Sequence, residues 1–363
     1  MRKGLHLLTF LLVIGMLLVA CDKTPKNSEG LEFTSNGDGT CELVRIGECT
    51  DADIVIPKES PDGDLVTSIG QSAFYDCKTM TSITIPDSVM SIGDGAFWGC
   101  KSLTSIMIPD SVTSIGIMAF LSCTSLTSVN VSEENTVYHS KDNCLIETET
   151  NTLILGCQTS IIPEYVISID EDAFRGCTGL THITIPDSVT SVEAGLFEYC
   201  TGLTSIHVSE RNPVYHSENN CLIETATNTL IAGCQTSIIP DSVTSIGEDA
   251  FASCIGLTSI TIPDSVTSIG DGAFQLCKGL SSITISDSVT SIGSSAFSGC
   301  NGLTSITIPD GVTYIGKDAF RFCASLTDVY YTGTEQEWAA MIIEDGNAIL
   351  SSAIIHYNYV PEE

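Results

Sequence analysis

The chain has 363 residues and a formal net charge of −31, with 45 acidic side chains against 14 lysines and arginines. Such a field repels phosphate backbones and anionic lipid head groups, and so few basic side chains cannot form a basic stripe. The composition therefore argues against nucleic acid as a partner and favours basic patches on other proteins.

The first twenty residues predict a secretory signal rather than part of the fold. A basic pair at 2–3 precedes an almost continuously apolar run at 5–20, the layout of a signal peptide. Residues 18–21 (LVAC) resemble the bacterial lipobox, in which the cysteine is lipidated and becomes the mature N-terminus. We expect cleavage after residue 20, lipidation of Cys21 and a polar tether at 21–30. An ordinary signal peptide with an accidental cysteine is the alternative.

One motif, a variant of I-x-I-P-D-S-V-T-S-I-G-x-x-A-F-x-x-C, occurs nine times, mostly at one fixed interval. A period of about 23 residues indicates a supersecondary unit that buries its apolar face only by stacking on copies of itself. The chain is therefore predicted to be a solenoid, whose long surface favours binding over catalysis. The phenylalanines of the motif are Phe74, Phe97, Phe120, Phe174, Phe197, Phe251, Phe274, Phe297 and Phe320.

Each copy predicts a strand, a turn, a second short extended segment and a helical turn. In the copy at 100–123 the strand follows L-x-x-I-x-I, so that its isoleucines face inward while Ser105 and Met107 face outward. Pro-Asp ends the strand, because proline has no N–H for the ladder and aspartate favours turns. Asp170 and Glu193 replace the corner glycine in two copies. We therefore do not expect that corner to be left-handed in every coil.

This pattern closely resembles the BspA-like (Treponema-type) leucine-rich repeat family, whose unit C-x-x-L-x-x-I-x-I-P-x-x-V-x-x-I-G-x-x-A-F is matched at 254–274. The resemblance spans roughly residue 31 to the C-terminus. It implies a β-rich solenoid with a parallel sheet on the concave face and short helical turns opposite. Family members are largely bacterial cell-surface proteins implicated in adhesion to host matrix proteins and other microbes. The family brings no catalytic residues, so the resemblance implies neither enzymatic activity nor a cofactor.

Two longer intervals break the period. The intervals from Phe120 to Phe174 and from Phe197 to Phe251 are equal, and each is more than twice the usual one. In each, two apolar runs flank a Thr-Asn pair, a pattern typical of a β-hairpin. We place these inserts near 132–158 and 209–235. Their equal length and closely similar sequences indicate that a larger unit was duplicated.

The two ends differ from the repeats and are expected to cap the stack. Strand-like composition without the A-F-x-x-C tail predicts an N-terminal cap at 31–66. The repeats then fill 67–323, and a C-terminal cap follows at 324–363. Within that cap we expect a strand, a helix that begins near Thr334 and a last strand at 354–359. A helix over the open end is one way in which solenoids avoid an exposed sheet edge.

Cysteine is the most prominent chemical signal, and nine thiols recur once per coil. A cysteine at this spacing is best interpreted as a small buried hydrophobe stacked in a ladder. A redox array or a metal tape would instead need thiols that converge on one point, whereas equivalent positions in a solenoid point in parallel. The ladder comprises Cys77, Cys100, Cys123, Cys177, Cys200, Cys254, Cys277, Cys300 and Cys323.

Each insert carries two further cysteines, at the same spacing in both inserts. If the hairpin turn is centred on Thr-Asn, the two lie on opposed strand positions near disulfide distance, and an exported protein can keep such a bond. Free buried thiols in a reducing niche are the alternative. Cys41 and Cys49 form a weaker third candidate pair. The candidate disulfides are Cys144–Cys157 and Cys221–Cys234.

The inserts also supply the candidate binding residues, because loops on a rigid scaffold carry specificity. Aromatic residues dominate interface energetics, so we name Tyr138 and Tyr215 as anchors, together with His139 and His216. Each histidine precedes an insert cysteine in H-x-x-x-x-C. Zinc or a Cys–His nucleophile is disfavoured, because no orienting third group is evident. The outward strand positions are the second candidate surface.

A column of aspartates follows the strands and could hold calcium between coils, but no copy supplies the clustered oxygens that calcium needs. We favour the interpretation that these aspartates are solvent-exposed turn residues, stacked from coil to coil. Hydrolase motifs such as G-x-S-x-G and H-E-x-x-H are missing from the sequence. We expect a non-enzymatic, monomeric protein without metal, lipid-anchored at the cell surface, that binds an extracellular protein of the host matrix or of another bacterium. A glycan-binding or calcium-dependent accessory protein is the alternative. The aspartates are Asp87, Asp110, Asp187, Asp241, Asp264, Asp287 and Asp310.

Overall fold

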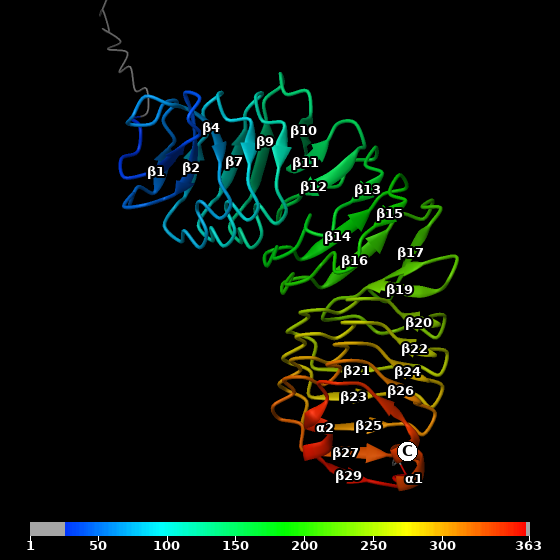
Figure 1. Cartoon of the computed structure of the whole chain (residues 1–363). Coiled ribbons are helices and arrows are strands. Elements are labelled where there is room, and N and C mark those ends of the chain that lie inside the picture. The colour runs from blue at the N-terminus through cyan, green and yellow to red at the C-terminus, as the bar shows by residue number, and fades with distance from the viewer. Residues whose placement is uncertain (1–25, 361–363) are drawn as a thin grey trace, which may run out of the picture.

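The computed structural model describes residues 26–360, which form a β-solenoid of stacked coils (Figure 1). The expected signal peptide, Cys21 and the first part of the expected tether lie outside the described residues. The last residues of the expected tether are part of the folded domain, because Ser28 is buried and its N–H donates to the Val55 carbonyl at 2.9 Å. Among residues 26–360, no helix is long and apolar enough to span a bilayer.

Each coil contributes one strand to a first parallel row, formed by the L-x-x-I-x-I segments. Along this row the isoleucines alternate with exposed side chains, as in β7, where Ile106 and Ile108 are buried and Met107 is exposed. The predicted inward and outward faces are therefore confirmed. The row comprises β3 (Asp53–Val55), β5 (Ser82–Thr84), β7 (Ser105–Ile108), β9 (Ser128–Val131), β14 (His182–Ile185), β16 (Ser205–Val208), β21 (Ser259–Thr261), β23 (Ser282–Thr284), β25 (Ser305–Ile308), β27 (Asp328–Tyr331) and β29 (Ile354–His356).

The Ser-Ile pairs that precede the corner glycine form a second parallel row of very short strands. Serine pairs with serine and isoleucine with isoleucine from coil to coil, as in Ser268↔Ser291 and Ile269↔Ile292. This in-register stacking is what a repeated sequence predicts. The row comprises β4 (Leu65–Ile69), β6 (Ser91–Ile92), β8 (Ser114–Ile115), β13 (Ser168–Ile169), β15 (Ser191–Val192), β20 (Ser245–Ile246), β22 (Ser268–Ile269), β24 (Ser291–Ile292), β26 (Tyr314–Ile315) and β28 (Ile342–Ile343).

The A-F-x-x-C segments close each coil as a chain of single turns rather than as a helix. Their phenylalanine rings stack in parallel, as in Phe274 and Phe297, whose centroids lie 5.3 Å apart. Within a regular stack, three N–H groups of each turn donate to carbonyls of the next. For the coil of Phe97 they run from Gly95 to Ile117, from Phe97 to Ala119 and from Gly99 to Leu121. We call these three bonds the turn ladder.

The corner glycines are required by close packing rather than by a left-handed backbone. Gly116 does not have a positive φ, but a Cβ built there would lie 2.5 Å from the backbone nitrogen of Asp94 in the preceding coil. Asp170 and Glu193 stand at this corner in the two coils that follow the first insert. The expectation that the corner is not left-handed in every coil is therefore confirmed.

Each insert is a three-stranded antiparallel meander that continues the second row. The first consists of β10 (Tyr138–Lys141), β11 (Cys144–Glu147) and β12 (Thr152–Leu155), and β12 then pairs in parallel with β13. The second repeats this arrangement with β17 (Tyr215–Glu218), β18 (Cys221–Glu224) and β19 (Thr229–Ala232). The predicted hairpins around Thr-Asn are confirmed, with one additional strand in each.

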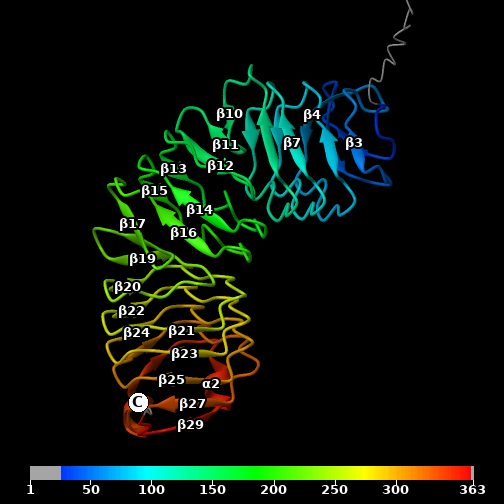
Figure 2. The same cartoon turned by 180° about the vertical axis from the view of Figure 1, so that it is seen from behind.

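The stack changes direction across the two inserts (Figures 1 and 2). In both views β20, β22 and β24 lie on the outer side of the bend, whereas the C-terminal helix α2 (Ala348–Ser352) lies on the inner side. The cause is geometric, because each insert adds strands to the second row without adding an A-F-x-x-C turn. The second row of strands is therefore longer along the stack than the column of turns, and the column of turns lies on the inner side of the bend.

Both ends of the stack are capped. At the N-terminus β1 (Glu32–Ser35) pairs antiparallel with β2 (Thr40–Arg45), which joins the second row. At the C-terminus α1 (Glu335–Ala340) begins at Thr334 with a capping box to Glu337. The predicted start of that helix is confirmed, and Thr-x-x-Glu is the sequence signal for it.

Candidate functional site

The nine cysteines that recur once per coil line the column of turns, and most of them make the same contact. The thiol of Cys100 donates to the Phe74 carbonyl at 3.1 Å, and that of Cys300 donates to the Phe274 carbonyl at the same distance. Burial raises the pKa of the Cys177 and Cys254 thiols to about 12. These thiols therefore act as buried donors between coils and not as nucleophiles at neutral pH.

The insert cysteines are free thiols in this structure. The strand register, Ile146↔Leu153 followed by a bulge to Leu145↔Leu155, does not set Cys144 opposite Cys157. The sequence argument centred the turn on Thr150-Asn151, which would pair Glu147 with Ile154. Glu147 instead pairs with Thr152, and the bulge then moves the register by one residue only. The two side chains also belong to different core clusters, since Cys144 packs with the core that runs to the second insert and Cys157 with that of the N-terminal coils.

The second insert repeats this arrangement, with Ile223↔Leu230 followed by a bulge to Leu222↔Ala232. Cys221 packs in the core of the C-terminal coils, whereas Cys234 packs in the core before it. In neither insert, therefore, are the two cysteines directly opposite each other, as the sequence argument had placed them, and both disulfides stay predictions.

The two tyrosines named as binding anchors are buried. Tyr138 packs into the core of the first coils and Tyr215 into the core between the inserts. The pKa of each phenol is raised, chiefly by burial. They therefore hold each meander onto the preceding coil and are not available as anchors. Sequence reasoning failed here because an aromatic residue in an insert looks the same whether it faces a partner or the core.

The two histidines remain accessible in part, but their surroundings differ. His139 Nδ1 lies 3.0 Å from Thr148 Oγ1, and its Nε2 lies 3.1 Å from the hydroxyl of Tyr165. His216 keeps the first contact, to Thr225 Oγ1 at 3.0 Å. The contact of Nε2 with a tyrosine hydroxyl has no counterpart at His216, because Ser242 stands where the first copy has Tyr165. Within residues 26–360, no group of three or more His, Cys, Asp or Glu side chains could hold a metal ion.

The segment after the first insert exposes three large apolar side chains in close succession. Ile161 is 69% exposed, Tyr165 is 41% exposed and Ile167 is 45% exposed, while Ile162 and Val166 between them are buried. His139 holds the Tyr165 ring, with the two ring centroids 5.7 Å apart. We call Ile161, Tyr165 and Ile167 the first-insert patch.

The second insert provides an internal comparison. Its segment at 238–244 keeps the exposed isoleucine, Ile238, but has Ser242 and Thr244 at the other two positions. The motif at 161–167 reads I-I-P-E-Y-V-I and that at 238–244 reads I-I-P-D-S-V-T. The sequence thus already showed that the first copy carries Tyr165 and Ile167 where the second has polar residues, and this difference could have identified the first-insert patch.

Beside the first insert, the turn ladder is interrupted. The Met118 N–H donates to a carboxylate oxygen of Asp172 at 3.2 Å instead of to a backbone carbonyl. A cleft of about 330 Å³ opens here between the turn at 115–121 and residues 170–172, with Ile154 and Leu155 of the insert also lining it.

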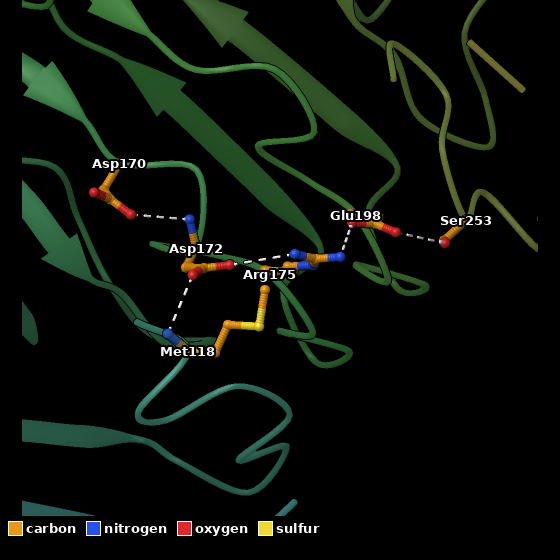
Figure 3. A network of polar contacts seen from close by, with 6 residues as sticks. All are labelled: Met118, Asp170, Asp172, Arg175, Glu198 and Ser253. Carbon is orange, nitrogen blue, oxygen red and sulfur yellow. Dashed lines mark hydrogen bonds and ion pairs between the residues drawn. The ribbon is translucent and has the colours of Figure 1, made fainter. Parts of the chain in front are cut away.

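A network of polar contacts joins the turns across both inserts (Figure 3). Arg175 pairs with Asp172 at 3.4 Å and with Glu198 at 2.5 Å, and Glu198 accepts a hydrogen bond from Ser253 at 3.4 Å. Burial raises the pKa of Glu198 in spite of Arg175, and it also raises the pKa of Asp249 nearby. One cation thus faces several carboxylates on the inner side of the bend.

Comparisons with known proteins agree with the repeat pattern. The chain matches the family model described as BspA type leucine-rich repeat region (6 copies) over residues 52–165, 156–229 and 231–345. It is 30% identical to a leucine-rich cell surface protein from Faecalibacterium prausnitzii A2-165, over 88% of this chain and 98% of that chain, with a TM-score of 0.48.

Two further solved structures are more distant. A leucine-rich repeat protein from Eubacterium ventriosum is 24% identical over 84% of this chain and 77% of that one, with a TM-score of 0.48. The pneumococcal vaccine antigen PcpA is 17% identical over 85% of this chain and 80% of that one, with a TM-score of 0.47. No curated protein matches the chain. On the family match, which spans most of its length, the chain belongs to the BspA-type leucine-rich repeat family.

Proposed function

We propose that this chain is a lipid-anchored cell-surface protein that binds another extracellular protein, of the host matrix or of a bacterial surface, through the first-insert patch. The membership in a family of leucine-rich repeat surface proteins supports the location and the binding role. The lipobox-like sequence at 18–21 supports the anchor. No catalytic motif accompanies the repeats, and a rigid solenoid that presents a long surface is suited to recognition.

The exposure of Tyr165 and Ile167 is the observation that carries the proposal. Exposed apolar side chains that gather on a rigid element mark interaction sites, and tyrosine is enriched among the residues that dominate binding energy. The Tyr165 ring is already held by His139, so little side-chain entropy is lost on binding. The same fold at 238–244 manages with serine and threonine, so folding does not require the apolar residues.

The test converts the first copy to the second. Tyr165→Ser with Ile167→Thr should leave the unfolding temperature nearly unchanged, since the second copy shows that the coil accepts these residues. Binding to wells coated with purified host-matrix proteins or bacterial surface proteins should fall by about 30-fold, the loss of one hot spot of about 2 kcal/mol. Ile238→Thr, in the second copy, is the matched control and should bind as the wild type does.

Two outcomes would count against the proposal. If the Tyr165/Ile167 double variant binds as well as the wild type, the partner does not bind the first-insert patch, and the outward-facing side chains of the first strand row become the candidate surface. Binding that vanishes in a chelator, or that free sugars compete away, would favour the calcium-dependent or glycan-binding alternative.

The anchor is tested separately. Cys21→Ala should release the protein from the membrane fraction or halt its maturation, because the lipobox-like sequence offers one thiol for the lipid. Unchanged membrane association in that variant would contradict lipidation at Cys21.

A further inference from the structure

The cleft beside the first insert combines apolar walls with a carboxylate that lacks a cationic partner. Ile117, on one wall, is 64% exposed, and Ile154 of β12 lies against the same space. Asp170 lines the opposite side, is half-buried, and makes no ion pair with any residue in 26–360. One of its oxygens accepts the Asp172 N–H at 3.1 Å. Its other oxygen has no hydrogen-bond partner within residues 26–360.

Burial raises the pKa of Asp170, and the neighbouring Asp172 and Glu193 carboxylates add to the shift. The neighbouring cation Arg175 is already engaged by Asp172 and Glu198. A carboxylate in this setting gains from a cation that reaches it through the cleft, because the surrounding protein offers less screening than water.

The same wall offers an unused backbone donor. In the regular coils the phenylalanine N–H donates to the next turn, as from Phe97 to Ala119 at 2.8 Å, and at the C-terminal end Phe320 donates to Asn347 Oδ1 at 3.0 Å. The Phe120 N–H, on the lining of the cleft, has no hydrogen-bond acceptor within the described chain. Because a backbone amide without an acceptor in the protein gains from one that a ligand supplies, the cleft is suited to a guest that brings a carbonyl oxygen.

We propose that this cleft receives a lysine or arginine side chain from an extended segment of the bound protein. The aliphatic part of the side chain packs between Ile117 and Ile154, its cationic end meets Asp170, and a main-chain carbonyl of the segment accepts from the Phe120 N–H. This inference rests on the proposed binding function and names the chemistry of the partner. It also agrees with the strongly acidic chain, which draws basic surfaces toward it.

The second insert again supplies an internal comparison. There Gly247 stands where the first junction has Asp170, and Ala194 and Gly195 replace Ile117 and Met118. The Phe197 N–H likewise has no acceptor within the described chain. The second junction thus keeps the open donor, and Ile231 at the position of Ile154, but it lacks the Asp170 carboxylate and the apolar side chain of Ile117.

The test uses short peptides, so that it does not depend on an identified partner. A short capped peptide with one central arginine is titrated into the mature protein, and the backbone amide signals are followed by NMR. We expect saturable shifts at Met118, Phe120 and Ile154, weakened by salt, and none at Phe197. A peptide with citrulline, the neutral counterpart of arginine, should bind at least about tenfold more weakly, the loss expected for one charge-assisted contact.

Two protein variants complete the design. Asp170→Asn keeps the oxygen that accepts the Asp172 N–H but removes the charge, and should weaken the arginine peptide about tenfold. Glu248→Gln removes a charge at the second junction and should change nothing. Equal binding of the citrulline peptide, equal binding to Asp170→Asn, or shifts spread over the whole acidic surface would each overturn the proposal. Because the peptide assay needs no partner, its failure is separable from a failure of the first-insert patch in the coated wells.

Discussion

The thiol of Cys277 donates to the carbonyl of Phe251 at 3.0 Å, from one coil of the stack to the one before it. The same carbonyl accepts the Cys254 N–H, so it serves its own coil and the next. This relationship explains why cysteine, and not alanine, ends each A-F-x-x-C turn. A small apolar side chain fills the corner, and its weak S–H donor joins neighbouring coils.

Loss of this donor should be measurable in chemical denaturation. Cys300→Ala removes a thiol that lies 3.1 Å from the Phe274 carbonyl and should lower the free energy of unfolding by about 1 kcal/mol. Cys254→Ala is the control, because its thiol lies 3.8 Å from the Gly233 carbonyl. The control should lose less, and an equal loss would show that packing alone accounts for the recurring geometry of the column.

Thiol titration should destabilise the fold at high pH. The pKa values of Cys177 and Cys254 are raised from 9.0 to about 12 by burial. Since the folded pKa is above the unfolded one, their contribution to stability is complete below about pH 9 and is lost as pH rises toward 12. Native protein at pH 8 should therefore react slowly with iodoacetamide at the ladder cysteines, and rapidly once denatured. Rapid native labelling of the ladder would contradict the buried column.

Mild acid should stabilise the protein. The pKa values of Glu198, Asp249 and Asp170 are all raised, in each case chiefly by burial. Stability is therefore gained as pH falls through these raised values toward the unfolded values of 4.5 for Glu and 3.8 for Asp. The melting temperature should rise as the pH is lowered from 7 toward 4.5. In Glu198→Gln the rise in melting temperature should be smaller. A melting temperature that falls steadily over this range would contradict the raised pKa values of these three carboxyl groups.

The phenylalanine column should be most sensitive within the regular stack. Phe274 stacks on Phe251 at 5.1 Å and on Phe297 at 5.3 Å. Phe274→Ala should lower the free energy of unfolding by about 3–5 kcal/mol through cavity formation. It should also broaden the transition, because coils depend on their neighbours. Phe197, whose one stacking neighbour is tilted at 6.3 Å, should tolerate the same change better. An equal loss of unfolding free energy in the two variants would show that Phe197 packs between the inserts as closely as Phe274 packs in the C-terminal coils.

The repeat period made most of the fold predictable. A side chain that recurs every coil must occupy equivalent surroundings, so the buried isoleucines, the Phe column and the cysteine ladder followed from spacing alone. The start of α1 at Thr334 followed from the capping box. These predictions share a local cause that the sequence displays directly.

The inserts were predicted less well, because their structure depends on contacts with the coils on either side. In the first insert Glu147 pairs with Thr152 rather than with Ile154, and a bulge at Leu145/Ile146 shifts the register again. No residue pattern predicts either change. Tyr138 and Tyr215 are buried by packing on a neighbouring coil, which the sequence does not place. Because insert side chains such as Tyr138 belong to the core, the binding surface is tested by point substitutions and not by deletion of an insert.

The location of the binding surface is tested most directly by hydrogen exchange of the complex. The mature protein is compared alone and with the matrix or bacterial surface protein that binds it most tightly in the coated wells. The account predicts slower exchange at residues 139–147 and 161–172, with residues 216–224 and 238–249 in the second copy unchanged. Equal protection of both copies, or protection confined to the outward strand row, would contradict it.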